Sequence, residues 1–207
     1  MQAGQRLAGL GVADRRPERE RVRALLDPPE VGNIANGSPI GDMPPAFIAL
    51  GAALTLRRGT ERRTIALEDF FLDYGKQDLG LSEFVESVRI PRPSPDMLVR
   101  IWKLSKRFDS DISGVCGAFA LRIENDIVRD ARVAFGGMAG IPARAPACEA
   151  ALTGKPWSEA AFHAASQAIA EDYQPLSDLR GSAEYRLAAA ANLVRGLWLE
   201  PESLFDV

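Results

Sequence analysis

The sequence is poor in histidine and cysteine, which limits the chemistry that it can perform by itself. His163 is the only histidine, and Cys116 and Cys148 are the only cysteines among 207 residues. A serine–histidine–aspartate set would depend on His163, which lies in a helical pattern. His163 also has no cysteine nearby, so a metal site made of protein ligands alone is not favoured. An iron–sulfur cluster needs about four ligands. Two cysteines without C-x-x-C spacing indicate a reducing, cytoplasmic setting.

The sequence also lacks long apolar runs and an excess of positive charge. No run approaches the roughly 20 apolar residues that span a membrane, and the N-terminus has no apolar core of a secretory signal. The net charge is −3, so electrostatics do not favour a nucleic acid as partner. The apolar fraction of 46% is high enough for a buried core, in one large domain or two small ones. We therefore expect no membrane and no nucleic-acid partner.

Residues 1–30 differ from the remainder of the chain. Residues 14–21 are almost all charged, and Pro28 and Pro29 close the segment. The few apolar residues between them leave little surface to bury, so we expect a divergent, poorly ordered segment or a loosely docked helix.

A first unit of mixed structure is predicted up to the proline-rich residues 91–95. Residues 46–53 have the pattern of a buried helix, and residues 54–57 and 63–67 that of a hairpin around Gly59. Residues 67–71 suggest a helical turn. Residues 84–90 suggest a strand with Val88 and Ile90 on one face and Arg89 on the other. The prolines then stop regular pairing and mark a boundary.

A second unit is predicted to be an antiparallel sheet followed by helices. Three strand-like runs occupy residues 98–106, 114–124 and 127–135, and the short turn at residues 124–126 favours a hairpin between the last two. Helical patterns follow at residues 147–153, at residues 158–173 with Ser158 as the cap, and at residues 182–199. The predicted fold class is α+β, with the helices on one sheet face. No G-x-G-x-x-G lies between a strand and a helix, so a Rossmann site is not supported.

Residues 32–45 are the first candidate for a ligand site. They combine three glycines, two asparagines, Ser38 and Asp42 directly before an apolar helix. Small side chains let backbone N–H groups approach a ligand, and a helix N-terminus favours anions. The alternative is an ordinary tight turn in which Asp42 is the N-cap of the helix.

Residues 103–112 are the second candidate. Strand alternation places Lys103, Ser105 and Arg107 on one face, where they could meet a phosphate or an electron-rich ring, or could keep an exposed sheet edge soluble. Asp109 and Asp111 are either a carboxylate pair or turn formers.

Two further segments have small or polar residues in groups. Residues 136–139, with Arg144, suggest a ligand-facing turn or a simple strand-to-helix connection. Residues 178–186 suggest a helix capped by Ser182 with a basic outer stripe that includes Arg186, and structural capping or an interface explains them better than a ligand site.

These four segments, in this order, resemble the molybdenum hydroxylase flavoproteins. Residues 32–42 are similar to the second FAD-binding motif of that family, and residues 103–113 resemble its K-S-x-R-x-x-D-I strand and loop. Residues 135–139 and 178–186 match in kind and order. The resemblance covers about residues 32–200 and is closest to the C-terminal part of the bacterial xanthine dehydrogenase small subunit.

The resemblance implies a fold and a role. Residues 31–94 would be the second lobe of a vanillyl-alcohol-oxidase (PCMH)-type FAD domain. Residues 97–204 would be a domain of the carbon monoxide dehydrogenase flavoprotein C-terminal type. In such enzymes a purine is oxidised at a molybdopterin centre on a large subunit, electrons pass through two [2Fe–2S] clusters to FAD, and FAD reduces NAD. The chain would supply the FAD-binding part of a xanthine dehydrogenase.

The family motif also implies which residues of the first loop approach FAD. Gly32 and Asn33 would approach the pyrophosphate through backbone N–H groups. Asn36 and Ser38 would bind nearby parts of the cofactor. Asp42 would accept a hydrogen bond from the pyrimidine edge of the isoalloxazine.

The remaining implied contacts come from strands. Val88 or Arg89 would line the ring through strand backbone, and Lys103 would lie near its polar edge. The loop at residues 107–111 would flank the flavin. None of these residues would be a nucleophile or a metal ligand.

The part of the chain that resembles the family includes neither the family's iron–sulfur domain nor its first FAD lobe. We therefore interpret the chain as a truncated fragment. One alternative is a non-catalytic assembly module that docks on the molybdenum subunit. Another is the flavoprotein of a different molybdenum hydroxylase, with an aldehyde, carbon monoxide or aromatic thioester as substrate.

Overall fold

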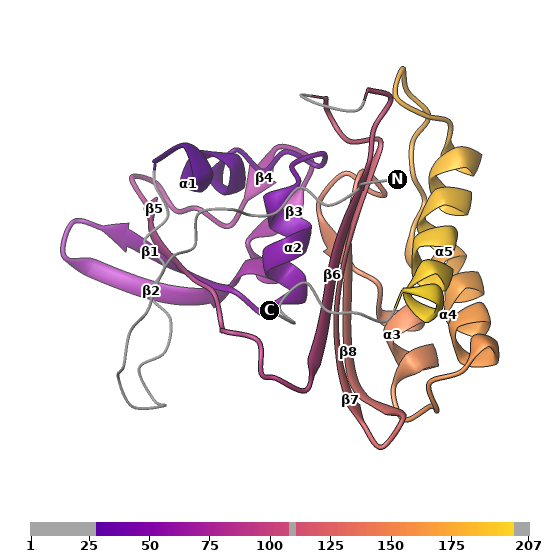
Figure 1. Ribbon diagram of the computed structural model, residues 1–207. Helices are drawn as coiled ribbons and strands as arrows, with labels where there is room; N and C mark the ends of the chain where they lie inside the picture. The colour runs from indigo at the N-terminus through magenta and orange to yellow at the C-terminus, as the bar shows by residue number, and fades with distance from the viewer. Residues whose placement is uncertain (1–27, 108–110, 201–207) are drawn as a thin grey trace.

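The computed structural model describes residues 28–107 and 111–200. The segment 1–27, the end of the second predicted unit after residue 200, and residues 108–110 of the predicted flavin-flanking loop lie outside the described residues. Within the described part, two hydrophobic cores lie on opposite faces of one four-stranded sheet. Figure 1 shows this sheet at the centre of the molecule.

The N-terminal part is small and of mixed structure. Its elements are α1 (Pro28–Ala35), α2 (Met43–Ala49), β1 (Ala53–Arg58), β2 (Glu61–Ala66), the 3₁₀ turn η1 (Leu67–Asp69), β3 (Phe71–Asp73), β4 (Lys76–Gln77) and β5 (Phe84–Arg89). Strands β2, β1 and β5 form an antiparallel sheet in that order, and β3 pairs with β4. The predicted hairpin and the predicted helical turn are confirmed.

The C-terminal part is an antiparallel sheet covered by helices. Its elements are β6 (Met97–Leu104), β7 (Val115–Glu124), β8 (Ile127–Gly136), β9 (Ala143–Arg144), α3 (Pro146–Leu152), α4 (Glu159–Asp172) and α5 (Ala183–Leu199). The strands are ordered β6-β7-β8-β9. The three predicted strands and the helices are confirmed, as are the caps, because the Ser158 and Ser182 hydroxyls accept hydrogen bonds from the Ala161 and Tyr185 N–H groups.

The two faces of the four-stranded sheet carry side chains of different size. Phe119 and Phe135 point toward α3, α4 and α5 and belong to the larger core. Ala118, Ala120 and Ala134 belong to the other core, together with residues of α2. These methyl groups let α2 pack directly on β7 and β8, and Figure 1 shows α2 between the small sheet and the large one. The sheet therefore places the N-terminal end of α2 beside the last residues of β6 and the first residues of β7.

Two local predictions are wrong. The predicted loop begins inside α1, which continues to Ala35, because Ile34 is fully buried and anchors the helix in the core. The predicted helix at residues 46–53 begins earlier, at Met43, and ends at Ala49. Gly51 adopts a φ of 70°, a left-handed backbone conformation that ends the helix before β1.

The packing of α2 on alanines generates a prediction about stability. We expect Ala118→Leu to lower the free energy of unfolding by about 1–3 kcal/mol, because the added carbons have no space between α2 and the sheet. Chemical denaturation of the two proteins measures the difference. Ala150→Leu, at an exposed position of α3, is the matched control and should stay within about 0.5 kcal/mol of the parent. Equal effects of the two variants would contradict the packing argument.

Candidate functional site

The carboxylate of Asp42 is the centre of the candidate site. It lies just before α2 and is held by two side chains from the C-terminal part. Lys103 Nζ donates to Asp42 Oδ2 at 2.7 Å, and the Ser113 hydroxyl donates to Oδ1. Asp42 and Lys103 keep 40% and 37% of their side-chain surfaces exposed, so a ligand can reach both charges. The site offers an acceptor and a cation side by side.

The alternative role of Asp42 as an N-cap is wrong. Its side chain makes no capping hydrogen bond to α2 and its backbone is in the helical region, whereas an N-cap usually has extended backbone. Pro44 and Pro45 stand in the first turn of α2 and have no N–H groups to offer. The expectation of an anion at this helix N-terminus therefore has no support, and Asp42 adds negative charge at the same place.

Lys103 reaches Asp42 because of the register of the large sheet. Lys103 on β6 pairs with Cys116 on β7, and its side chain follows Val99 and Ile101 along the face that α2 covers. Cys116 lies below the ion pair, with its Sγ 3.8 Å from the Asp42 carbonyl oxygen. Burial, and then the Asp42 charge, raise the pKa of the Cys116 thiol to about 12. This thiol therefore stays protonated and acts as a packing group.

The loop before Asp42 is held by its own turns and by the glycine-rich turn after β8. Gly37 has a φ of 60°, and the Ser38 hydroxyl accepts from the Ile40 N–H at 3.4 Å. The Gly137 N–H donates to the Pro39 carbonyl at 2.7 Å. The candidate turn at residues 136–139 therefore holds the loop in place. Arg144 forms ion pairs with Glu149 and Glu68.

Arg186 connects the same elements from beneath. Its side chain is 3% exposed, and it donates to the carbonyls of Gly114 and Gly137 at 2.7 Å each and to Asp178 at 2.6 Å. The predicted basic outer stripe is therefore wrong at this residue. The signal was present, because the spacing to Ala190, Val194 and Leu197 places Arg186 on the buried face of α5.

Gly32 and Asn33 lie within α1, which changes what they can offer. From the fifth residue of a helix onward, each N–H bonds the carbonyl four residues earlier, so the backbone N–H groups of Gly32 and Asn33 are not aimed at a ligand. The Asn33 side chain is different. Its Oδ1 is buried and has no hydrogen-bond partner among the described residues. A buried acceptor of this kind is unfavourable by about 1–3 kcal/mol until a donor reaches it.

The other predicted residues are partly brought together. Asn36 is exposed in the turn two residues before Ser38. Val88 and Arg89 pair with Leu54 and Ala53 at the start of β1, which follows the C-terminal end of α2, so the helix separates them from Asp42. Val88 is buried and Arg89 is exposed.

Asp111 accepts hydrogen bonds from the Arg107 and Ile112 N–H groups, as a turn former does. Asp109 lies outside the described residues.

The predicted row on the face of β6 is only partly formed. Lys103 lies on the strand, but β6 ends at Leu104, before Ser105 and Arg107. The Ser105 hydroxyl instead donates to the Arg107 carbonyl at 2.8 Å, within the following turn. Lys106 donates to the Leu179 carbonyl at 2.6 Å, so this turn is tied to the segment before α5.

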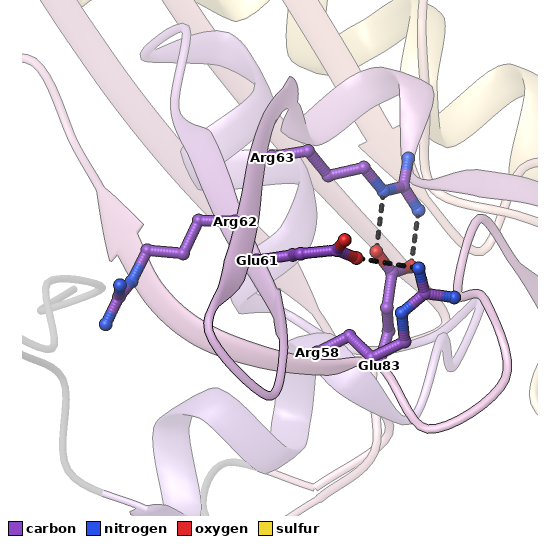
Figure 2. Close-up of a pocket in the computed structure, with 5 residues that line it drawn as sticks. All are labelled: Arg58, Glu61, Arg62, Arg63 and Glu83. Atoms are coloured by element: carbon purple, nitrogen blue, oxygen red, sulfur yellow. Dashed lines mark hydrogen bonds and ion pairs between the residues drawn. The ribbon is translucent and has the colours of Figure 1, made fainter.

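A hollow of about 380 Å³ lies elsewhere, on the β1–β2 hairpin. Figure 2 shows Arg63 facing Glu83, Arg58 facing Glu61, and Arg62 pointing away from them. Arg63 binds Glu83 and Asp78 at 2.7 Å each, and Arg62 binds Glu86 at 2.6 Å. The cations that line this hollow are thus matched by carboxylates, and we do not assign it a ligand.

The described residues contain no group of three or more histidine, cysteine, aspartate or glutamate side chains that could hold a metal ion. Within the same ranges no helix has the length and apolar character that crossing a membrane requires.

Two family models match the chain. The model described as the FAD binding domain in molybdopterin dehydrogenase matches residues 30–93, and that of the CO dehydrogenase flavoprotein C-terminal domain matches residues 100–201. Together they span most of the described residues, and each of the four sequence segments lies within one of them. The predicted α+β fold of a PCMH-type lobe followed by a flavoprotein C-terminal domain is confirmed.

Named relatives and a solved structure agree with these matches. The chain is 36% identical over 174 residues to nicotinate hydroxylase of Emericella nidulans, covering 81% of this chain and 13% of that protein. It is 34% identical over 146 residues to xanthine dehydrogenase 2 of Arabidopsis thaliana, covering 68% and 11%. A carbon monoxide dehydrogenase from Hydrogenophaga pseudoflava, lacking the Mo-pyranopterin moiety of its molybdenum cofactor, superposes with a TM-score of 0.77 at 31% identity, covering 83% of this chain and 62% of that one. The chain spans about an eighth of the length of these two relatives.

The contacts of Arg186 generate a prediction. We expect Arg186→Met to lower the free energy of unfolding by about 2–4 kcal/mol, because it leaves the Gly114 and Gly137 carbonyls buried without a donor. Thermal and chemical denaturation measure the loss. Arg195→Met, at an exposed position of the same helix, is the control and should change stability by no more than about 0.5 kcal/mol. A loss no larger than that of the control would show that Arg186 does not hold these segments.

The hairpin charges generate a prediction about pH. Hydrogen bonds from Arg63 and from the Gly80 N–H lower the pKa of Glu83 to about 2, and a hydrogen bond from Arg62 lowers that of Glu86 to about 2. Both pKa values lie below the ordinary glutamate value of about 4.3. The stabilisation from these two charged carboxylates is therefore present above pH 4.3 and is lost as the pH falls toward 2. Carboxyl chemical shifts followed by NMR should show both midpoints. Arg63→Met should raise the midpoint of Glu83 and leave the midpoint of Glu86, the internal control, unchanged.

Proposed function

Because the chain belongs to the FAD-binding region of the molybdenum hydroxylases, we propose that it binds the isoalloxazine end of FAD beside Asp42 and Lys103. The observation that carries the proposal is the Asp42–Lys103 pair, joined at 2.7 Å from the two matched domains and open to a ligand. FAD, when bound, supplies the redox chemistry, and the chain supplies binding, orientation and electrostatics.

The residues present fit this cofactor. The pyrimidine edge of a flavin carries both an N–H donor and carbonyl acceptors, which Asp42 and Lys103 complement. The unpartnered Asn33 oxygen can accept from a hydroxyl or N–H group of the cofactor, so Asn33 acts through its side chain. Asn36 and Ser38 lie between Asn33 and Asp42 in the chain and complete the polar loop.

Charge compensation explains why Asp42 can face a cofactor that gains electrons. An isolated carboxylate beside a reduced flavin would repel it, whereas Lys103 at 2.7 Å offsets that charge. Partial exposure keeps the pair hydrated, so its own contribution to folding is about 0–1 kcal/mol. The pair is therefore better suited to recognition than to stability.

We further propose that residues 31–94 and 97–204 act as two domains of a larger oxidoreductase. In this proposal a molybdopterin-binding large subunit oxidises a purine, two [2Fe–2S] clusters on another domain or subunit deliver electrons, and NAD accepts them from FAD in the cytoplasm. The similarity to relatives named for nicotinate and for xanthine supports a molybdenum hydroxylase with either kind of substrate. A non-catalytic module that docks on the molybdenum subunit is the competing proposal, and loss of flavin binding would favour it.

Titration of the 207-residue chain with FAD tests the proposal. We expect quenching of flavin fluorescence by the parent protein, and about tenfold weaker binding by Asp42→Asn, because a hydrogen bond to a charged acceptor becomes a weaker one to a neutral amide. The melting temperature without FAD should change little. Asp130→Asn, at an exposed position of β8, is the control and should bind like the parent.

Two outcomes count against the proposal. If the parent chain binds no flavin but co-purifies with a molybdenum subunit, the assembly module is the better description. If Asp42→Asn and Asp130→Asn bind FAD equally well, the flavin does not lie beside Asp42.

A further inference from the structure

We propose that Ser113 is a positioning residue that holds the Asp42 carboxylate in the orientation that binds the flavin. The inference rests on the proposed function, because it names the residue through which the same site is ordered. Ser113 donates to Asp42 Oδ1 from the segment between β6 and β7. The two residues are 71 positions apart and come from different matched domains.

Ser113 itself is rigidly placed. The residue is 2% exposed, and both the N–H and the carbonyl of the next residue are hydrogen-bonded. The Gly114 N–H donates to the Leu104 carbonyl at 2.8 Å, and the Gly114 carbonyl accepts from Arg186 at 2.7 Å. The hydroxyl therefore presents one donor at a fixed point beneath Asp42.

The two partners of Asp42 contribute differently. Lys103 is a long side chain with 37% of its surface exposed, and it loses rotamer freedom whenever it is held in one geometry. Ser113 has a single side-chain torsion before its hydroxyl and is buried. Hydrogen bonds at both carboxylate oxygens prevent rotation about the last torsion of Asp42, and the buried one restricts it with less loss of entropy. Such preorganisation increases the affinity for a ligand without a direct contact.

Ser113 is not a nucleophile in this arrangement. Its hydroxyl donates to a carboxylate, and His163, the one histidine of the chain, lies on α4 on the other side of the sheet. Ser113 as a residue is 2% exposed, which leaves no room for a reacting substrate at its hydroxyl. Its effect on the flavin is therefore exerted through Asp42.

Four proteins test the inference: the parent 207-residue chain, Ser113→Ala, Ser113→Thr and Ser166→Ala. Ser166 is the matched control, because it is 5% exposed and its hydroxyl donates to the His163 carbonyl at 2.7 Å, within α4. FAD affinity, the position of the visible flavin band, and the melting temperature without FAD are measured for each. The affinity and the band report on the site, and the melting temperature reports on structure alone.

We expect Ser113→Ala to weaken FAD binding about tenfold and to move the visible band, with a loss of melting temperature no larger than that of Ser166→Ala. Ser113→Thr keeps the hydroxyl and should restore most of the affinity. If Ser113→Thr does not fold, the comparison of the two alanine variants still decides.

The outcomes separate the two proposals. If the parent chain binds no FAD, the proposed function fails and the role of Ser113 fails with it. If the parent binds FAD and Ser113→Ala binds it equally well, only the role of Ser113 is overturned. Equal weakening by Ser113→Ala and Ser166→Ala, in proportion to melting temperature, would also overturn it, because the effect would then be general.

Discussion

The buried guanidinium of Arg186 is the interaction on which the candidate site depends. It binds the carbonyls of Gly114, at the end of the β6–β7 connection, and of Gly137, at the start of the β8–β9 connection. Gly114 follows Ser113, and the Gly137 N–H holds the Pro39 carbonyl. One side chain from α5 thus fixes both the donor beneath Asp42 and the loop that carries Asp42. A lysine has no planar fork of donors and could not hold these carbonyls in the same geometry.

The alanines of β7 and β8 make the second essential contribution. Ala118, Ala120 and Ala134 are almost fully buried and leave room for α2 against the sheet. The opposite face carries Phe119 and Phe135, which fill the larger space beneath α3, α4 and α5. A strand with large residues on both faces would hold α2 farther away, and Asp42 would lie beyond the reach of Lys103 and Ser113. The size difference between the faces therefore sets the geometry of the site.

Charge density alone does not identify the site. The hairpin of β1 and β2 carries four arginines, yet Glu61, Glu83, Glu86 and Asp78 form ion pairs with them. The Asp42–Lys103 pair has fewer charges, but it lies where two domains meet, and the unpartnered Asn33 oxygen lies against Gly41, the residue before Asp42. The unsatisfied polar group and the domain boundary are more informative than the number of charges.

Local signals in the sequence determined much of the secondary structure. The hairpin around Gly59, the caps Ser158 and Ser182 and the alternating face of β7 follow from rules that involve a few neighbouring residues. The same rules predicted a loop at residues 32–35, because glycine and asparagine disfavour helices. These residues instead belong to α1, which the burial of Ile34 stabilises. Only the tertiary structure brought Asp42 to Lys103 and Ser113, across 61 and 71 residues, and only it gave the Arg186 guanidinium its carbonyl partners, Gly114 and Gly137. Contacts over such separations depend on how a helix packs on a sheet, and no local pattern encodes that packing.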